Sequence, residues 1–320
     1  MEKTDSLLYV DSSPHIHSNN SISTAMRDVI IALIPAVLAS LYYFRLQALS
    51  VIIVSVVTAI VAEYICQKLM KKEVTISDYS AAVTGLLLAL TLPPGLPLGM
   101  VILGSAVAIV IGKQFFGGLG GNIFNPALIG RAVLVASFPA ALTTWIVPFD
   151  TITGATPLGI LKGTGNLSLL PSVWDSFIGN LGGSLGETSA LALLIGAIYL
   201  LARKHIDWKI PVIYIATVFV FGVGLGFRNG GGLDFALTYI LSGGLVLGAF
   251  FMATDWVTTP VTKIGRIIFA LGCGLLTVLI RIKGGYPEGV CYSILIMNGF
   301  VPLIDRYTKG KVFGEGSKNG

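Results

Sequence analysis

Apolar segments alternate with short polar segments along nearly the whole chain, and this alternation predicts a bundle of membrane-spanning helices. Several apolar segments are shorter than the roughly 20 residues that cross a bilayer. Short segments flanked by Gly and Pro are tolerated where they are buried among other helices. We therefore predict ten helices, over residues 26–44, 48–70, 80–92, 97–111, 123–138, 187–202, 210–227, 233–253, 265–280 and 289–304.

The composition supports this interpretation. Of the 320 residues, 54% are hydrophobic and 12% are charged, about half the charged fraction of a soluble domain. The net charge of +5 does not indicate nucleic-acid binding, because most basic residues lie in short loops between apolar segments. The three cysteines lack CxxC spacing and form no disulfide framework or metal cluster by local spacing. The fold class that follows is an all-α polytopic membrane protein.

The distribution of basic residues predicts how the chain is oriented. If ten helices alternate in direction, the loops on one side hold Lys68, Lys71, Lys72, Lys113, Arg203, Lys204, Lys209, Lys263, Arg266, Arg306, Lys309 and Lys311. The opposite loops hold only Arg45, Lys162, Arg228, Arg281 and Lys283. Because cytoplasmic loops are enriched in Lys and Arg, both termini are expected in the cytoplasm and the long loop on the outer face of the cell membrane.

A faint internal repeat suggests how the helices are grouped. Residues 84–88 resemble residues 242–246, and residues 117–124 resemble residues 284–292 with one insertion. Five helices in each repeat would make the two repeats inverted, an architecture typical of transporters with broken helices. The predicted regions are a cytoplasmic segment 1–25, a first repeat 26–138, an external loop 139–186, a second repeat 187–304 and a cytoplasmic tail 305–320.

The external loop carries the most specific motif. Asp150, Thr153, Gly154, Ala155 and Thr156 fit the pattern Asp-x-x-(Ser/Thr)-Gly-Ala-(Ser/Thr). This pattern resembles the motif at which a flavin transferase esterifies the phosphate of FMN to the last hydroxyl. Small preceding residues and a following proline predict an accessible hydroxyl in an extended segment. The alternative interpretation is a polar turn between two membrane helices.

Few polar residues lie within or beside the predicted helices, and such residues are usually functional. Arg131 is a candidate partner for an anionic group such as a flavin. Asn122 and Asn125 either cap the helix that follows them or face a ligand at its positive end. These residues lie at the N-terminal end of the fifth predicted helix. In the internal repeat, this position matches residues 287–289, at the N-terminal end of the tenth. We therefore hypothesise that a second flavin lies between these two openings, as we call the helix ends, with Arg131 adding a full positive charge.

Two further carboxylates have competing interpretations. Asp255 lies among three threonines, an oxygen-rich group suited either to Na⁺ or to capping a turn. Glu63 lies near Lys68, which suggests an interfacial ion pair at the end of a helix. The three histidines lie at termini or in loops, and we do not expect them to bind a metal.

Short motifs in the same order extend the resemblance over nearly the whole sequence. They are residues 13–15, 23–36, 92–94, 124–127, 252–255, 285–290, 297–298 and 302–305. The chain resembles the family that holds the D subunit of the Rnf ion-translocating oxidoreductase and the B subunit of the Na⁺-translocating NADH:quinone reductase. Trp256 departs from the pattern, because we expect a proline after Asp255 in this family. The quinone-reductase member has a longer N-terminal part, so the Rnf branch is favoured.

The resemblance implies a subunit of an oxidoreductase complex with no complete activity alone. It implies FMN esterified to Thr156 and a non-covalent riboflavin. Implied partners are other integral membrane subunits and a second subunit with covalent FMN, which relay electrons between ferredoxin and NAD while Na⁺ or H⁺ crosses the membrane. The alternatives are a component of the quinone reductase, an inverted-repeat solute transporter or channel without a redox role, and a structural scaffold.

Overall fold

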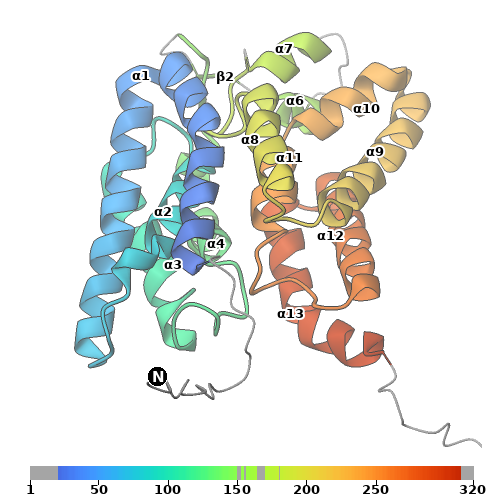
Figure 1. Ribbon diagram of the computed structural model, residues 1–320. Coiled ribbons are helices and arrows are strands. Elements are labelled where there is room, and N and C mark those ends of the chain that lie inside the picture. The colour runs from blue at the N-terminus through green and yellow to red at the C-terminus, as the bar shows by residue number, and fades with distance from the viewer. Residues whose placement is uncertain (1–20, 150–152, 155, 164–169, 180, 311–320) are drawn as a thin grey trace, which may run out of the picture.

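The computed structural model describes residues 21–149, 153–154, 156–163, 170–179 and 181–310 (Figure 1). Within these ranges the secondary structure is almost entirely helical, with one two-stranded antiparallel sheet of β1 (Trp145–Ile146) and β2 (Thr153–Gly154). The helices of the first part are α1 (Ile22–Leu69), η1 (Ile76–Asp78), α2 (Ser80–Leu90), α3 (Leu98–Val110), η2 (Gln114–Phe116), α4 (Pro126–Ser137) and α5 (Pro139–Leu142). Those that follow are α6 (Pro157–Gly163), α7 (Val173–Ile178), α8 (Ala190–Ala202), α9 (Lys209–Asn229), α10 (Gly232–Leu241), α11 (Leu245–Leu247), η4 (Gly248–Met252), α12 (Lys263–Lys283) and α13 (Val290–Thr308).

The long helix α1 is two helices joined at a sharp reversal. Its 48 residues would extend about 72 Å if straight, more than twice the hydrocarbon thickness of a bilayer. Arg45 has φ 49° and ψ −125°, which are not helical angles. The chain therefore turns back, and the two limbs lie side by side (Figure 1). These limbs correspond to the predicted helices 26–44 and 48–70.

The predicted helix 233–253 is wrong as a single helix. The structure breaks it between α10 and α11, and the two parts are bent by 58°. Gly243 and Gly244 have φ of 74° and 66°, in the left-handed region that glycine adopts without steric cost. A β-carbon on Gly243 would also collide with Leu158 and Arg281. The break therefore depends on glycine at this position.

The architecture is that of a helical membrane protein. In the described part of the chain, four helical segments are long and apolar enough to cross a membrane: α1, α3 with η2, α9 and α12. The bent pair of α10 with α11–η4 makes a fifth if it is one span, and α2, α4 and α8 are shorter apolar helices. Large apolar side chains stay exposed on the outer faces of the long helices, among them Leu38, Val57, Ile102, Val220 and Leu279. Such faces are suited to contact with lipid.

The two parts of the chain pack through α8. In Figure 1 the limbs of α1 with α2–α4 form one side of the molecule, α9–α13 form the other, and α8 lies between them. Gly196 of α8 lies directly against the carbonyl oxygen of Ala32 in α1, where a β-carbon would not fit. The segment with β2, α6 and α7 lies at one end of the molecule, and the last turn of α13 lies at the opposite end (Figure 1).

Candidate functional site

Thr156 lies at the start of the short helix α6. Its Oγ1 accepts a hydrogen bond from the backbone N–H of Gly159 at 3.1 Å, and its carbonyl accepts one from Ile160 at 2.9 Å. The expectation of an accessible hydroxyl is wrong, because Thr156 is only 5% exposed. The reason is that α6 packs back onto the protein, with Pro157 and Leu158 also buried. Thr156 is thus the capping residue of a docked helix.

The remaining residues of the motif are described only in part. Thr153 and Gly154 form β2, and Gly154 pairs with the buried Trp145 of β1. The small sheet anchors the backbone just before Thr156. Asp150 and Ala155 lie outside the described residues.

The α6 segment contacts the second half of the chain at two places. Leu158 reaches Gly243 at the break between α10 and α11. Lys162 Nζ donates hydrogen bonds to the carbonyl oxygens of Gly284 and Tyr286, the latter at 2.8 Å. Any group attached to Thr156 is therefore held beside the helix break and the segment before α13.

A buried arginine lies at the helix break. Arg281, in the last turn of α12, is 6% exposed. Its Nη1 donates to the carbonyl of Tyr239 at 2.5 Å, and its Nη2 donates to the carbonyl of Ser242 at 2.8 Å. The guanidinium also lies 4.6 Å from the centre of the Tyr239 ring. Three elements, α6, α10 and α12, thus meet around Gly243.

Arg131 lies at the predicted second opening, beside Glu288, but apart from Asn122 and Asn125. Its guanidinium forms an ion pair with Glu288, and both side chains line a cavity of about 30 Å³. That volume holds about two water molecules and no flavin ring. Glu187 lies nearby, where its carboxylate accepts the N–H of Gly243. Burial and the neighbouring Glu288 carboxylate raise the pKa of Glu187 to about 7.

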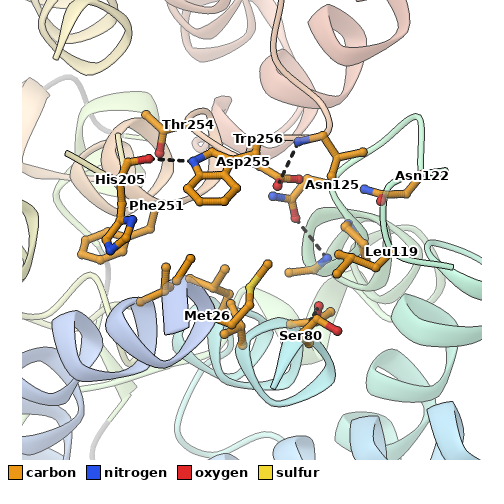
Figure 2. A pocket seen from close by; sticks show the side chains of 18 of the residues that line it. Met26, Ser80, Leu119, Asn122, Asn125, His205, Phe251, Thr254, Asp255 and Trp256 are labelled. Carbon is orange, nitrogen blue, oxygen red and sulfur yellow. Dashed lines mark hydrogen bonds between the residues drawn. The ribbon is translucent and has the colours of Figure 1, made fainter. Parts of the chain in front are cut away.

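A larger cavity of about 250 Å³ lies between the first and second halves of the chain (Figure 2). Apolar side chains such as Met26 and Phe251 form most of its wall. Polar side chains also line it, among them Asn122, Asp255 and Trp256. A concave apolar site with a few convergent polar groups is typical of small-molecule binding.

Asn125 caps α4, one of the two roles predicted for it. Its Oδ1 accepts from the N–H groups of Ala127 and Leu128 at 3.1 and 3.4 Å. Its Nδ2 donates to the carbonyl of Met252 at 3.3 Å, and its backbone N–H donates to Asn298 Oδ1 at 3.3 Å. The residue also lines the larger cavity, so capping and a place in the cavity wall are combined. Through these bonds it joins the two halves of the chain.

Asn122 and Asp255 also lie in the wall of this cavity. Asn122 donates from its amide to the carbonyl of Phe124 at 3.2 Å and does not cap α4. Asp255 accepts from Thr258 Oγ1 at 3.2 Å, and its carbonyl accepts from Thr259 Oγ1 at 2.8 Å. This is the turn-capping arrangement. Among the described residues, no group of three or more His, Cys, Asp or Glu could hold a metal ion.

Trp256, at the position where we expected a proline, has a specific contact. Its indole N–H donates to the carbonyl oxygen of His205 at 2.6 Å (Figure 2). Proline could not make this bond, so the tryptophan adds a link between the turn after η4 and the segment after α8.

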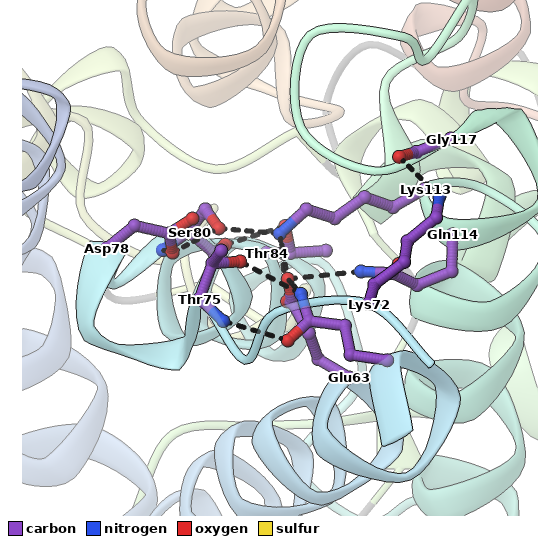
Figure 3. Close-up of polar contacts among 10 residues, drawn as sticks. Glu63, Lys72, Thr75, Asp78, Ser80, Thr84, Lys113, Gln114 and Gly117 are labelled. Atoms are coloured by element: carbon purple, nitrogen blue, oxygen red, sulfur yellow. Dashed lines mark hydrogen bonds and ion pairs between the residues drawn. The ribbon is translucent and has the colours of Figure 1, made fainter. Parts of the chain in front are cut away.

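Glu63 forms an ion pair, but the predicted partner, Lys68, is wrong. Lys113 Nζ lies 2.8 Å from both carboxylate oxygens of Glu63 and 2.5 Å from Ser80 Oγ (Figure 3). Lys68 instead donates to the hydroxyl of Tyr64 at 3.1 Å. By sequence position alone, Lys113 is a loop charge. The fifty residues between Glu63 and Lys113 give no local signal of the pair, which depends on how α3 packs against α1.

Comparison with known proteins identifies the family of the chain. A model of the NQR2, RnfD, RnfE family matches residues 9–314. The chain belongs to this family. Within the family, it is 49% identical over 316 residues to the D subunit of the proton-translocating ferredoxin:NAD(+) oxidoreductase complex of Clostridium ljungdahlii, covering 95% of this chain and 96% of that one. It is 48% identical over 311 residues to the D subunit of the Na(+)-translocating ferredoxin:NAD(+) oxidoreductase complex of Acetobacterium woodii, covering 96% and 95%.

A more distant family member has a similar name. The D subunit of the ion-translocating oxidoreductase complex of Stutzerimonas stutzeri is 38% identical over 343 residues, covering 93% of this chain and 94% of that one. The resemblance predicted from the motifs is confirmed. Relatives at 48% and 49% identity are named for different ions, so overall similarity does not select the ion for this family member.

Proposed function

We propose that the chain is the D subunit of an Rnf-type complex that couples electron transfer between ferredoxin and NAD to the translocation of Na⁺ or H⁺. We further propose that it carries FMN through a phosphoester on Thr156. The proposed subunit identity rests on the similarity, over nearly the full length, to relatives named as this subunit. The proposed attachment of FMN rests on the position of Thr156 in the flavinylation motif.

The local geometry of Thr156 is compatible with such an ester. The oxygen that accepts the N–H of Gly159 would become the bridging ester oxygen and keep a lone pair for this bond. Esterification removes only the hydroxyl proton from Thr156, and the phosphate loses its own leaving group, so the sum is FMN plus threonine less one water. Because the side chain is 5% exposed, α6 has to move away before a modifying enzyme reaches it. We therefore propose that attachment precedes the final docking of α6.

The residues around α6 would position the attached group. FMN supplies one- and two-electron transfer, and the protein supplies orientation and electrostatics. Leu158 and Lys162 hold α6 against the second half of the chain, which limits how far a group on Thr156 can move. A covalent tether keeps the effective concentration of the flavin high near an electron partner.

We also propose that the larger cavity binds the second, non-covalent flavin. Of the three residues predicted for it, Asn122 and Asn125 line this cavity. Arg131 lines the smaller cavity and is held there by Glu288, so it would act through its charge and not by contact. The volume of about 250 Å³ is near the lower end of the range for ligand pockets, about 300 Å³ and above. For Asp255 we propose turn capping, with Na⁺ binding as the weaker alternative.

The finer topology is part of the proposal. It comprises ten helices in two inverted repeats, both termini in the cytoplasm, and the Thr156 loop on the outer face of the cytoplasmic membrane. The position of α6 and α7 at the end opposite the last turn of α13 supports it (Figure 1). The proposed partners are the other integral membrane subunits and a second subunit with covalent FMN.

Intact mass spectrometry tests the covalent flavin. The full chain is co-expressed with a flavin transferase and compared with Thr156→Ala and Thr156→Ser. Wild type and Thr156→Ser should gain the mass of one FMN less one water and fluoresce on a denaturing gel, whereas Thr156→Ala should not. Equal labelling of Thr156→Ala would refute the attachment site. A colourless, unmodified wild type would favour a transporter or channel.

A further inference from the structure

Buried polar atoms without a partner gather at the break between α10 and α11. In the part of the chain that the structure describes, four buried side-chain atoms have no hydrogen-bond partner: Tyr239 Oη, Ser242 Oγ, Arg281 Nε and Glu288 Oε1. The first three belong to the group around Gly243. Most buried polar groups in proteins are paired, so three unpaired groups in one place indicate a missing partner.

Arg281 carries a buried charge without a direct ion pair at this place. It forms no ion pair with any residue in the described ranges, although the Glu187 carboxylate accepts the N–H of the neighbouring Gly243. Two of its nitrogens donate to backbone carbonyls, which stabilise a cation but carry no net charge. Nε keeps a free N–H at 6% residue exposure. A buried charge is expensive unless it is paired, so the missing partner should be an anion.

The other unpaired groups are suited to oxygen atoms of an anion. Ser242 is 2% exposed and its hydroxyl is free to donate. The Tyr239 hydroxyl belongs to the ring that the guanidinium covers, so it lies beside the same cation. Arginine and hydroxyl donors together form the arrangement that binds phosphate oxygens.

The Thr156 segment brings a candidate phosphate to this place. Leu158 and Arg281 Nη2 both lie against Gly243, at the position that a β-carbon would occupy. Thr156 caps the helix that contains Leu158. A phosphate on Thr156 would be a diester with one negative charge and two free oxygens. It would match the single charge of Arg281.

We propose that Arg281, together with Ser242, binds the phosphate of the FMN esterified to Thr156. This inference rests on the proposed function, because it takes the phosphate from that ester. Binding would neutralise the buried guanidinium and hold α6 in its docked position. A lipid headgroup or free phosphate would offer the same chemistry, and the experiment separates these sources.

Thermal unfolding in detergent, with and without flavin, tests the proposal. The full chain is expressed with and without the flavin transferase as wild type, Arg281→Gln and Arg228→Gln. Arg228 is an exposed arginine in the last turn of α9 and serves as the matched control. Flavin attachment should raise the Tm of wild type and of Arg228→Gln by several degrees and leave that of Arg281→Gln unchanged. Gel fluorescence verifies equal flavin content.

The other outcomes overturn the proposal. An equal rise in Arg281→Gln means that Arg281 does not bind the ester phosphate. If phosphatidylglycerol or inorganic phosphate stabilises the flavin-free wild type but not Arg281→Gln, and flavin adds nothing, the site takes that phosphate instead. If wild type acquires no flavin, the proposed attachment at Thr156 is refuted. Gel fluorescence detects this outcome independently of Tm.

³¹P NMR of the flavin-loaded protein tests the same contact if Arg281→Gln does not fold. Arg281→Lys retains the charge but loses the planar donor geometry. The ³¹P resonance of the phosphodiester should shift between wild type and Arg281→Lys and stay in place in Arg228→Lys. An unchanged resonance in Arg281→Lys overturns the assignment.

Discussion

Lys113 and Glu63 form an ion pair in which the ammonium nitrogen is 2.8 Å from each carboxylate oxygen, although 50 residues separate them in sequence. At most 2% of either side chain is exposed. Gln67 and Gln114 also donate to the carboxylate, and Ser80 accepts from the ammonium (Figure 3). The pair links the second limb of α1 to the end of α3, beside the larger cavity.

Removing one member of this pair should destabilise the protein strongly. Lys113→Met leaves Glu63 buried without its counter-charge, which typically costs about 3–5 kcal/mol. Thermal unfolding in detergent should show a Tm many degrees below that of wild type. Lys68→Met is the control, because its partner Tyr64 lies on the exposed surface. Equal losses in the two variants would contradict the structural role of the buried pair.

The stability of the chain should depend on pH through Glu187. The pKa of this carboxyl is about 7 when folded and 4.5 in its ordinary state, so the folded chain binds more protons between these values. The stabilisation is complete below about pH 4.5 and is lost as the pH rises through 7. Tm should therefore fall between pH 5 and pH 8, and Glu187→Gln should flatten this part of the profile. The same slope in Glu187→Gln would assign the titration to another group.

Binding of the second flavin should depend on Asn122 more than on Arg131. Asn122→Ala alters the wall of the larger cavity, so the purified complex should release several-fold less acid-extractable flavin. Arg131→Gln should reduce it less, because Arg131 lines the smaller cavity. Asn229→Ala, at the exposed end of α9, is the matched control. A greater loss in Arg131→Gln would place the flavin at the smaller cavity.

Single cysteines should report which faces of the membrane the chain exposes. The native cysteines are first replaced by alanine. Thr144→Cys, within the predicted external loop, and Lys309→Cys, after α13, are both at exposed positions. In intact cells, an impermeant thiol reagent should label only the first, and lysis should make the second reactive. Labelling of Lys309→Cys alone would invert the proposed orientation.

The alternation of apolar and polar segments determined where most of the long apolar helices lie, because burial in lipid requires a continuous apolar stretch with its backbone bonds satisfied inside it. The ends of the predicted helices 80–92 and 265–280 lie within three residues of those of α2 and α12. The order of short motifs also determined the family, since such motifs are local in sequence. Asn125 was found for the same reason, because a helix cap is a relation between neighbouring residues.

Only the tertiary structure decided which distant residues meet. The break at Gly243 could not be distinguished from an ordinary glycine in an apolar helix until Leu158 and Arg281 were seen against it. The burial of Thr156, the pairing of Lys113 with Glu63, and the separation of Arg131 from Asn122 depend in the same way on packing between helices. The physical reason is that a charge in an apolar interior is stabilised by whichever counter-charge the fold brings within reach, and sequence spacing does not encode that distance.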